Sequence, residues 1–162
     1  MRAEPVLQLG YLVGALQIVL PALDVALRTW PPRPGDVTWR FGAGGILFGS
    51  IATPLIGVLL LLAAAALTDR PVLVRVIGGA TAFASLTIGL LLPLFALDWA
   101  QLRGSMDSRA LREFDRNSLQ VLFEGALCAA AGLWMGVASW RAVRKGRPSA
   151  PVVSGRPKAD AA

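Results

Sequence analysis

The sequence contains no histidine, a single cysteine and only two lysines among its 162 residues. Without histidine the chain cannot supply imidazole ligands to haem, zinc or copper, or form a Ser-His or Cys-His nucleophile pair. Cys128 alone can form neither an internal disulfide nor a CxxC redox pair. We therefore expect no cofactor, no metal site and no catalysis; a lipid-modifying enzyme that uses Asp or Glu with a metal is the least favoured alternative.

Charge is also scarce, because only 16% of the residues are charged while 55% are hydrophobic. The charges are placed so that long apolar stretches lie between them, each near the roughly 20 residues that cross the hydrocarbon core of a bilayer as a helix. These stretches lie at about 5–26, 41–67, 73–97 and 117–140. The sequence predicts an all-α integral membrane protein, with an antiparallel bundle of four transmembrane helices over residues 1–140.

Basic residues indicate how the predicted bundle is oriented. Four spans place both termini on one side of the membrane, and that side holds nine of the sixteen basic residues. By the positive-inside rule both termini are predicted to be cytoplasmic, with the first span kept as an anchor. The preference for Arg over Lys is typical of a GC-rich bacterial genome, so the expected location is the bacterial inner (cytoplasmic) membrane.

The segment 141–162 is basic, rich in proline and poor in large apolar residues. We predict a disordered cytoplasmic tail that lies against the anionic headgroups of the lipid bilayer. Nucleic acid is not expected as a partner, because no aromatic residues alternate with the basic ones. The connection 104–118 is predicted either to lie at the interface as an amphipathic helix or, by slight preference, to extend the fourth span.

Small residues recur at four-residue spacing on three of the predicted spans. In lipid, helices associate where small residues let their backbones approach closely. We therefore predict helix packing through these faces, which would equally serve a homo-oligomer or a larger membrane complex. The glycines concerned are Gly10, Gly14, Gly45, Gly49, Gly57, Gly132 and Gly136.

Glu124 is the one charged residue within the fourth span. A carboxylate in the membrane is costly and by default marks a functional site. Its four-residue spacing to Cys128 and Gly132 predicts that it points into the bundle, where Arg40 at the outer start of the second span is the candidate partner. Either Glu124 couples transport to a proton or cation, or it is a paired or protonated structural residue near the outer edge.

Two aspartates occupy similar sequences at the outer ends of the first and third spans. Asp24 and Asp98 each lie in an Ala-Leu-Asp-x-Ala segment that follows a proline. A duplicated two-span hairpin would place them as an acidic pair at an outer mouth, with Glu124 below; chance is the alternative in a sequence this rich in Leu and Ala.

Two functions from different classes follow from these patterns. The favoured one is a small polytopic inner-membrane protein that acts without catalysis, as an accessory or scaffold subunit held by helix packing. The alternative is a small channel or a proton- or cation-coupled carrier that uses Glu124 together with Asp24 and Asp98.

Overall fold

The computed structural model describes residues 4–145, and this part of the chain is entirely helical, with no β-strand. The helices are α1 (Glu4–Arg28), α2 (Val37–Ser50), α3 (Ala52–Leu67), α4 (Pro71–Arg103) and α5 (Ser108–Lys145). Helices α1, α4 and α5 are each long and apolar enough to cross a membrane, and the bent pair of α2 and α3 makes a fourth span if it is counted as one. An all-helical chain with candidate membrane spans is therefore confirmed. Residues 146–162 of the predicted tail lie outside the described residues.

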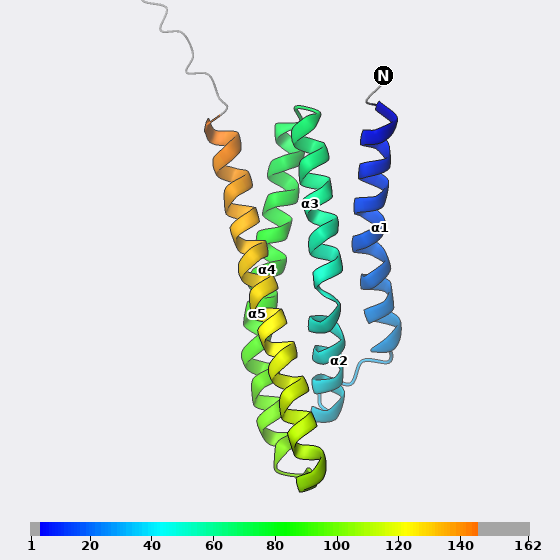
Figure 1. The fold of residues 1–162 in the computed structure, drawn as a ribbon, viewed down its shortest axis with the longest axis vertical. Coiled ribbons are helices and arrows are strands. Elements are labelled where there is room, and N and C mark those ends of the chain that lie inside the picture. Colours follow the sequence, from blue (N-terminus) through cyan, green and yellow to red (C-terminus); the bar gives the residue numbers. More distant parts are fainter. Residues whose placement is uncertain (1–3, 146–162) are drawn as a thin grey trace, which may run out of the picture.

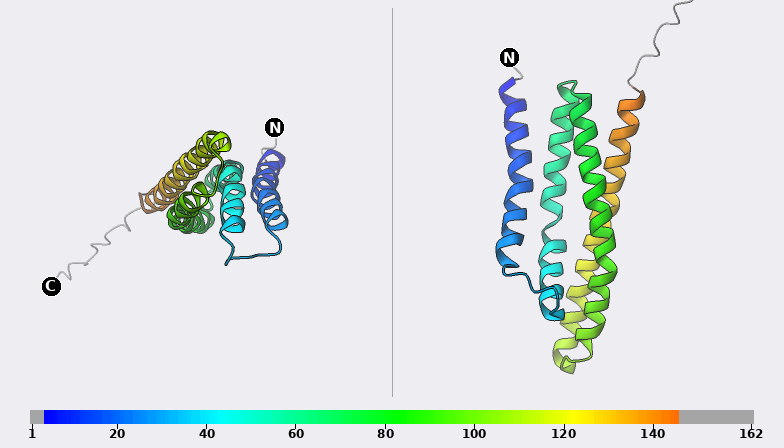
Figure 2. Two further views of the ribbon diagram at one scale, coloured as in Figure 1. Left: turned by 90° about the horizontal axis from the view of Figure 1, so that it is seen from below. Right: turned by 180° about the vertical axis from the view of Figure 1, so that it is seen from behind.

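If α2 and α3 are taken as one bent segment, the chain runs alternately down and up the long axis, so that the start of α1 and the end of α5 lie at the same end (Figure 1). α1 packs mainly on α3, α4 packs mainly on α5, and α2 contacts both members of the second pair. In the described part of the chain α1 makes no close approach to α4 or α5. The helices thus form an open arrangement with α1 at one side (Figure 2).

The turn between α3 and α4 is as short as the sequence predicts. Asp69 adopts a left-handed backbone conformation with φ 49°, which aspartate tolerates better than most residues. The backbone N–H groups of Asp69 and Arg70 donate to the carbonyls of Ala66 and Ala65 at 3.2 and 3.1 Å, which is the Schellman pattern of a helix end. Pro71 then begins α4, where its missing N–H leaves no bond unmade.

The predicted span 41–67 is not one continuous helix. It is interrupted at Ile51, and α2 and α3 meet at an angle of 41°. Pro54 accounts for the break, because it has no N–H to donate to the carbonyl of Ser50 and its ring crowds that carbonyl. Pro21 and Pro93 lie within the continuous helices α1 and α4.

The segment 104–118 does not form a separate interfacial helix. Ser108 begins α5, which continues without a break to Lys145, so the predicted extension of the fourth span is confirmed and also includes the first residues of the predicted tail. At 1.5 Å per residue its 38 residues make a helix about 57 Å long. Since the hydrocarbon core is about 30 Å thick, the α4–α5 pair must extend beyond it.

Glycines bring the backbones together at both helix pairs. A Cβ atom added to Gly57 would lie 2.7 Å from the carbonyl oxygen of Gly14, so α1 and α3 meet through backbone atoms. Gly132 and Gly136 both face α4: a Cβ atom on Gly132 would overlap the hydroxyl of Ser85, and one on Gly136 would lie 2.8 Å from the carbonyl oxygen of Gly78. Such contacts are the main source of cohesion between helices in lipid.

Candidate functional site

An ion pair joins the start of α2 to the last turns of α4. Asp36 caps α2 by accepting hydrogen bonds from the backbone N–H groups of Thr38 and Trp39 at 2.8 and 3.3 Å. Arg40 then lies in the first turn, where its Nη2 and Nε donate to the two carboxylate oxygens of Asp98 at 2.6 and 3.0 Å. The side chain of Asp98 is only 6% exposed and that of Arg40 is 38% exposed. This bidentate pair fixes the start of α2 against the last turns of α4.

Glu124 lies deeper than Arg40 can reach, so the predicted pair of these two residues does not form. Its neighbour Gly125 faces Phe48, whose Cγ would be 3.3 Å from a Cβ atom there. Glu124 is therefore level with Phe48, which lies two turns, or about 12 Å, along the helix from Arg40. The half-buried Glu124 instead accepts a hydrogen bond at 2.9 Å from Nε2 of Gln120, one turn earlier on α5.

Asp24 lies in surroundings unlike those of Asp98. Its carboxylate is 50% exposed and accepts from Nε of Arg28, one turn further along α1, at 2.8 Å. Because α1 does not closely approach α4, the predicted acidic pair is not brought together. Each of the two aspartates is instead paired with its own arginine, and neither lies beside Glu124.

A third ion pair was not predicted from the sequence. Asp115, near the start of α5, accepts a hydrogen bond from the indole Nε1 of Trp99 at 3.1 Å and forms an ion pair with Arg103 at 2.9 Å. Both partners lie in the last two turns of α4. The sequence pattern that could have predicted this contact is the helix-like spacing across 109–116. That spacing extends the fourth span outward, and the extension places Asp115 beside the end of the third span.

A cluster of phenylalanines surrounds the buried ion pair. Phe95 stacks on Phe41 with ring centroids 4.7 Å apart and meets Phe48 edge-on at 5.4 Å. Phe41 also contacts Phe114 of α5, at 5.1 Å. Phe48 is only 1% exposed, which makes it the largest fully buried side chain in the described residues. These rings tie α2, α4 and α5 together around Asp98 and strengthen its pairing with Arg40 by excluding water.

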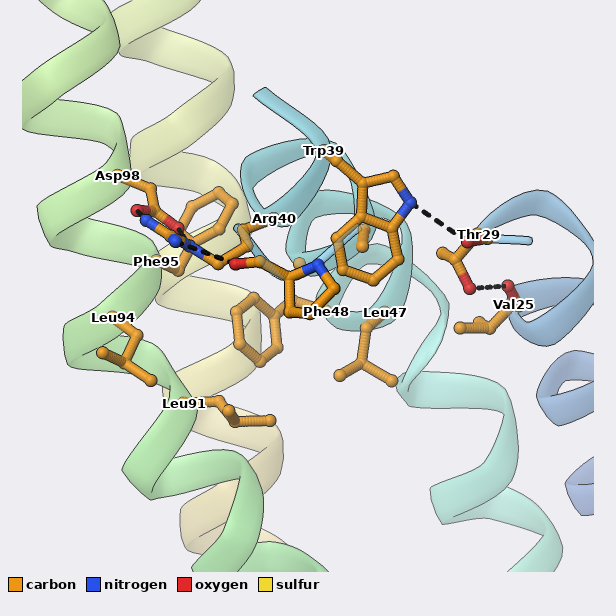
Figure 3. Close-up of a pocket in the computed structure, with 13 residues that line it drawn as sticks. Val25, Thr29, Trp39, Arg40, Leu47, Phe48, Leu91, Leu94, Phe95 and Asp98 are labelled. Atoms are coloured by element: carbon orange, nitrogen blue, oxygen red, sulfur yellow. Dashed lines mark hydrogen bonds and ion pairs between the residues drawn. The ribbon is translucent and has the colours of Figure 1, made fainter. Parts of the chain in front are cut away.

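A cavity of about 350 Å³ opens beside this cluster, between α1 and α4 and across one face of α2 (Figure 3). Its walls are mostly apolar and include Leu47, Leu91 and Leu94. At one end lies the Arg40–Asp98 pair, while Trp39 donates from Nε1 to the carbonyl of Thr29 at 3.0 Å and so links α2 to the end of α1. The cavity contains neither Asp24 nor Glu124.

The predicted packing glycines divide into used and open positions. Gly14, Gly57, Gly132 and Gly136 lie in tight helix contacts, and Gly10 makes an ordinary contact with Ala64. A Cβ atom on Gly45 or Gly49 would meet no atom within 4 Å. These two glycines lie about 100° around α2 from the contact face, which Gly44 and Phe48 form against α4 and α5.

Three small residues follow one another at four-residue spacing across the α2–α3 break: Gly45, Gly49 and the exposed Thr53. We refer to these three residues as the open ridge. A groove of about 480 Å³ begins at Thr53, lies between α1 and the break, and includes Gln17 and Ser50 in its lining. The side-chain oxygen of Gln17 is buried without a hydrogen-bond partner in the described residues. The hydroxyl of Ser50 donates to the carbonyl of Leu47 at 3.1 Å.

Within residues 4–145, fold and site together define a helical protein whose helices are long and apolar enough to span a membrane. Every carboxylate singled out from the sequence has a local partner there. No family model, curated protein or solved structure matches this chain.

Proposed function

We propose that this chain is a four-span protein of the bacterial inner membrane, with cytoplasmic termini, that acts without catalysis as an accessory or scaffold subunit. The open ridge carries the proposal. The predicted packing glycines of the other spans already contact helices inside the molecule, whereas a Cβ atom on Gly45 or Gly49 would have no neighbour within 4 Å. A ridge of this kind lets a helix of another subunit approach closely, and in lipid this is how helices associate.

The position of the open ridge adds to this argument. It crosses the break at Ile51, where the helix axis turns by 41°, so a partner helix would meet a fixed bend rather than a straight rod. Ser50 and Gln17 line the adjoining groove, so polar side chains border the ridge. Shape and polarity together would then select one partner over the many apolar helices in a membrane.

Affinity purification in a mild detergent tests the proposal, with wild type compared with a double variant, Gly45→Leu and Gly49→Leu. The bulky side chains would hold a partner helix away from the ridge, so we expect a specific membrane protein to accompany the wild type and to be lost from the variant. Gly89→Leu on α4 is the matched control, since Gly89 is also exposed with nothing within 4 Å. A wild type that purifies alone, or a partner that the double variant retains, would refute the proposal.

The alternative is a channel or coupled carrier that uses Glu124 with Asp24 and Asp98. It is less well supported, because these carboxylates lie on three helices and no described cavity is lined by two of them. Flux of protons or cations into proteoliposomes distinguishes the two functions. We expect the wild type and Glu124→Gln to match protein-free liposomes; a flux that depends on Glu124 would favour the carrier.

A further inference from the structure

Glu124 brings a carboxylate into the candidate membrane span of α5, at a distance from every described cation. The nearest basic residue on α5 is Arg116, eight residues and about 12 Å earlier, and Arg40 is about as far away along α2. None of the described ion pairs includes Glu124, and its one described hydrogen bond comes from the neutral side-chain amide of Gln120. Within residues 4–145, no positive charge compensates this carboxylate.

The half-buried Glu124 lies on the flank of α5 that is turned away from α4. Asp115, which contacts the end of α4, lies about 80° to one side of Gly125, which faces Phe48 of α2. Glu124 lies about 100° to the other side of Gly125, and Gln120 about 140° to that side. Going round α5 from the α4 contact, one therefore passes the α2 contact before reaching Glu124.

The open ridge lies on the same side of the molecule. On α2, Gly44 faces α4 and Phe48 faces α5. Phe48 lies about 40° round the helix from Gly44, while Gly45 and Gly49 lie about 100° and 140° round in the same direction. The ridge and Glu124 thus both lie beyond the α2–α5 contact from α4, and the end-on view shows α2 and α3 between α5 and α1 on this open side (Figure 2).

We propose that the partner helix on the open ridge carries a lysine or arginine that forms an ion pair with Glu124. This inference rests on the proposed function and names the chemistry of the partner that the ridge would hold. The glycines allow a helix to approach α2 closely. At the level of Phe48, that helix would pass the carboxylate of Glu124 on the flank of α5. Charges within a membrane pair with one another because an uncompensated charge is costly there.

The depth of Glu124 decides where the cation comes from. An amine of a lipid headgroup lies at the membrane surface, whereas Glu124 lies about 12 Å further along α5 than the exposed Arg116. A second copy of this chain in the same orientation is no better as a source, because the described basic residues all lie near helix ends or in connections. A basic residue inside a span of a different protein fits this depth.

Binding of synthetic transmembrane peptides to the full chain in phosphatidylcholine nanodiscs tests the proposal. The peptides are Ala/Leu helices of about 20 residues with lysine, leucine or glutamate at the centre, close to the depth of Glu124. By fluorescence energy transfer, we expect the lysine peptide to bind the wild type about tenfold more tightly than the leucine peptide. Glu124→Gln should abolish this preference. Asp24→Asn, which removes a carboxylate that already has Arg28 as its partner, should retain it.

Equal binding of the lysine and leucine peptides to the wild type would overturn the ion pair, as would a lysine preference that survives Glu124→Gln or disappears in Asp24→Asn. The glutamate peptide keeps the proposal testable if Glu124→Gln fails to fold: it should bind the wild type no better than the leucine peptide, and tighter binding would overturn the role of charge. The double variant Gly45→Leu with Gly49→Leu should bind all three peptides less. If it does so while lysine gives no preference, the ridge function stands and only the ion pair fails; unaltered binding by this variant would contradict both.

Discussion

Among single residues, the unequal burial of Asp98 and Arg40 decides what each substitution should cost. Arg40→Gln leaves a carboxylate that is 6% exposed without its cation, whereas Asp98→Asn leaves a guanidinium that is 38% exposed and can turn to water or headgroups. We expect Arg40→Gln to lower the free energy of unfolding by about 2–3 kcal/mol, below the value for a wholly buried pair. Asp98→Asn should cost about 1 kcal/mol. Thermal unfolding in detergent measures both.

The double variant Arg40→Gln with Asp98→Asn is the control for this asymmetry. It removes both charges, so it should recover much of the loss seen with Arg40→Gln alone. Two results would contradict this account of the ion pair. One is a larger loss of stability with Asp98→Asn than with Arg40→Gln. The other is a loss in the double variant that equals the sum of the losses in the two single variants.

Glycine positions give a second prediction at the residue scale. A methyl group at Gly57 would sit 2.7 Å from the backbone oxygen of Gly14, and only a shift of α1 against α3 could relieve this contact. Gly57→Ala should therefore cost about 1–3 kcal/mol of stability. Gly89→Ala, where a Cβ atom meets nothing, should be neutral or slightly stabilising. Equal melting temperatures for the two variants would contradict the close α1–α3 contact.

At the scale of elements, the α2–α3 break depends on Pro54. Pro54→Ala restores an N–H that can donate to Ser50, so the two helices should straighten toward one span. Spin labels at the exposed Thr38 and Leu67 should then move apart by roughly 3 Å, as rise per residue and the 41° bend require. As a control, Pro21→Ala should not change the distance between two spin labels on α1 to a comparable extent. If the Thr38–Leu67 distance is unaltered in Pro54→Ala, helix packing and not Pro54 causes the bend.

How much the sequence could predict differs between elements. Runs of apolar residues are enough to locate the helices, and the turn at 67–71 and the helical extension at 108–116 follow from local patterns. The partner of Arg40 is decided by the depth of each residue in the membrane as well as by its charge. The start of one span and the end of the next antiparallel span lie at the same depth. Arg40 therefore pairs with Asp98 and not with Glu124. Periodicity found the glycines but not which face of α2 is covered, because Gly44 and Gly45 are neighbours in sequence and only Gly44 meets Phe95.

For the whole molecule, the open arrangement predicts unequal local stability. α1 contacts only α2 and α3 in the described residues, whereas α4 and α5 pack along most of their length and are tied to α2 by the phenylalanine cluster. Amide hydrogen exchange in nanodiscs should therefore be faster in the lipid-buried part of α1 than at matched depth in α4 and α5. Equal protection of all these helices would indicate a closed bundle instead.

Site-specific photo-crosslinking in intact membranes tests the proposed packing function most directly. A photoreactive residue replaces Gly49 on the open ridge in one variant and Gly89 on α4 in the other, both at exposed positions without neighbours. The account predicts a discrete protein adduct from position 49 and only lipid adducts from position 89. Lipid adducts alone from both positions, in membranes where the chain is present at its natural level, would contradict it.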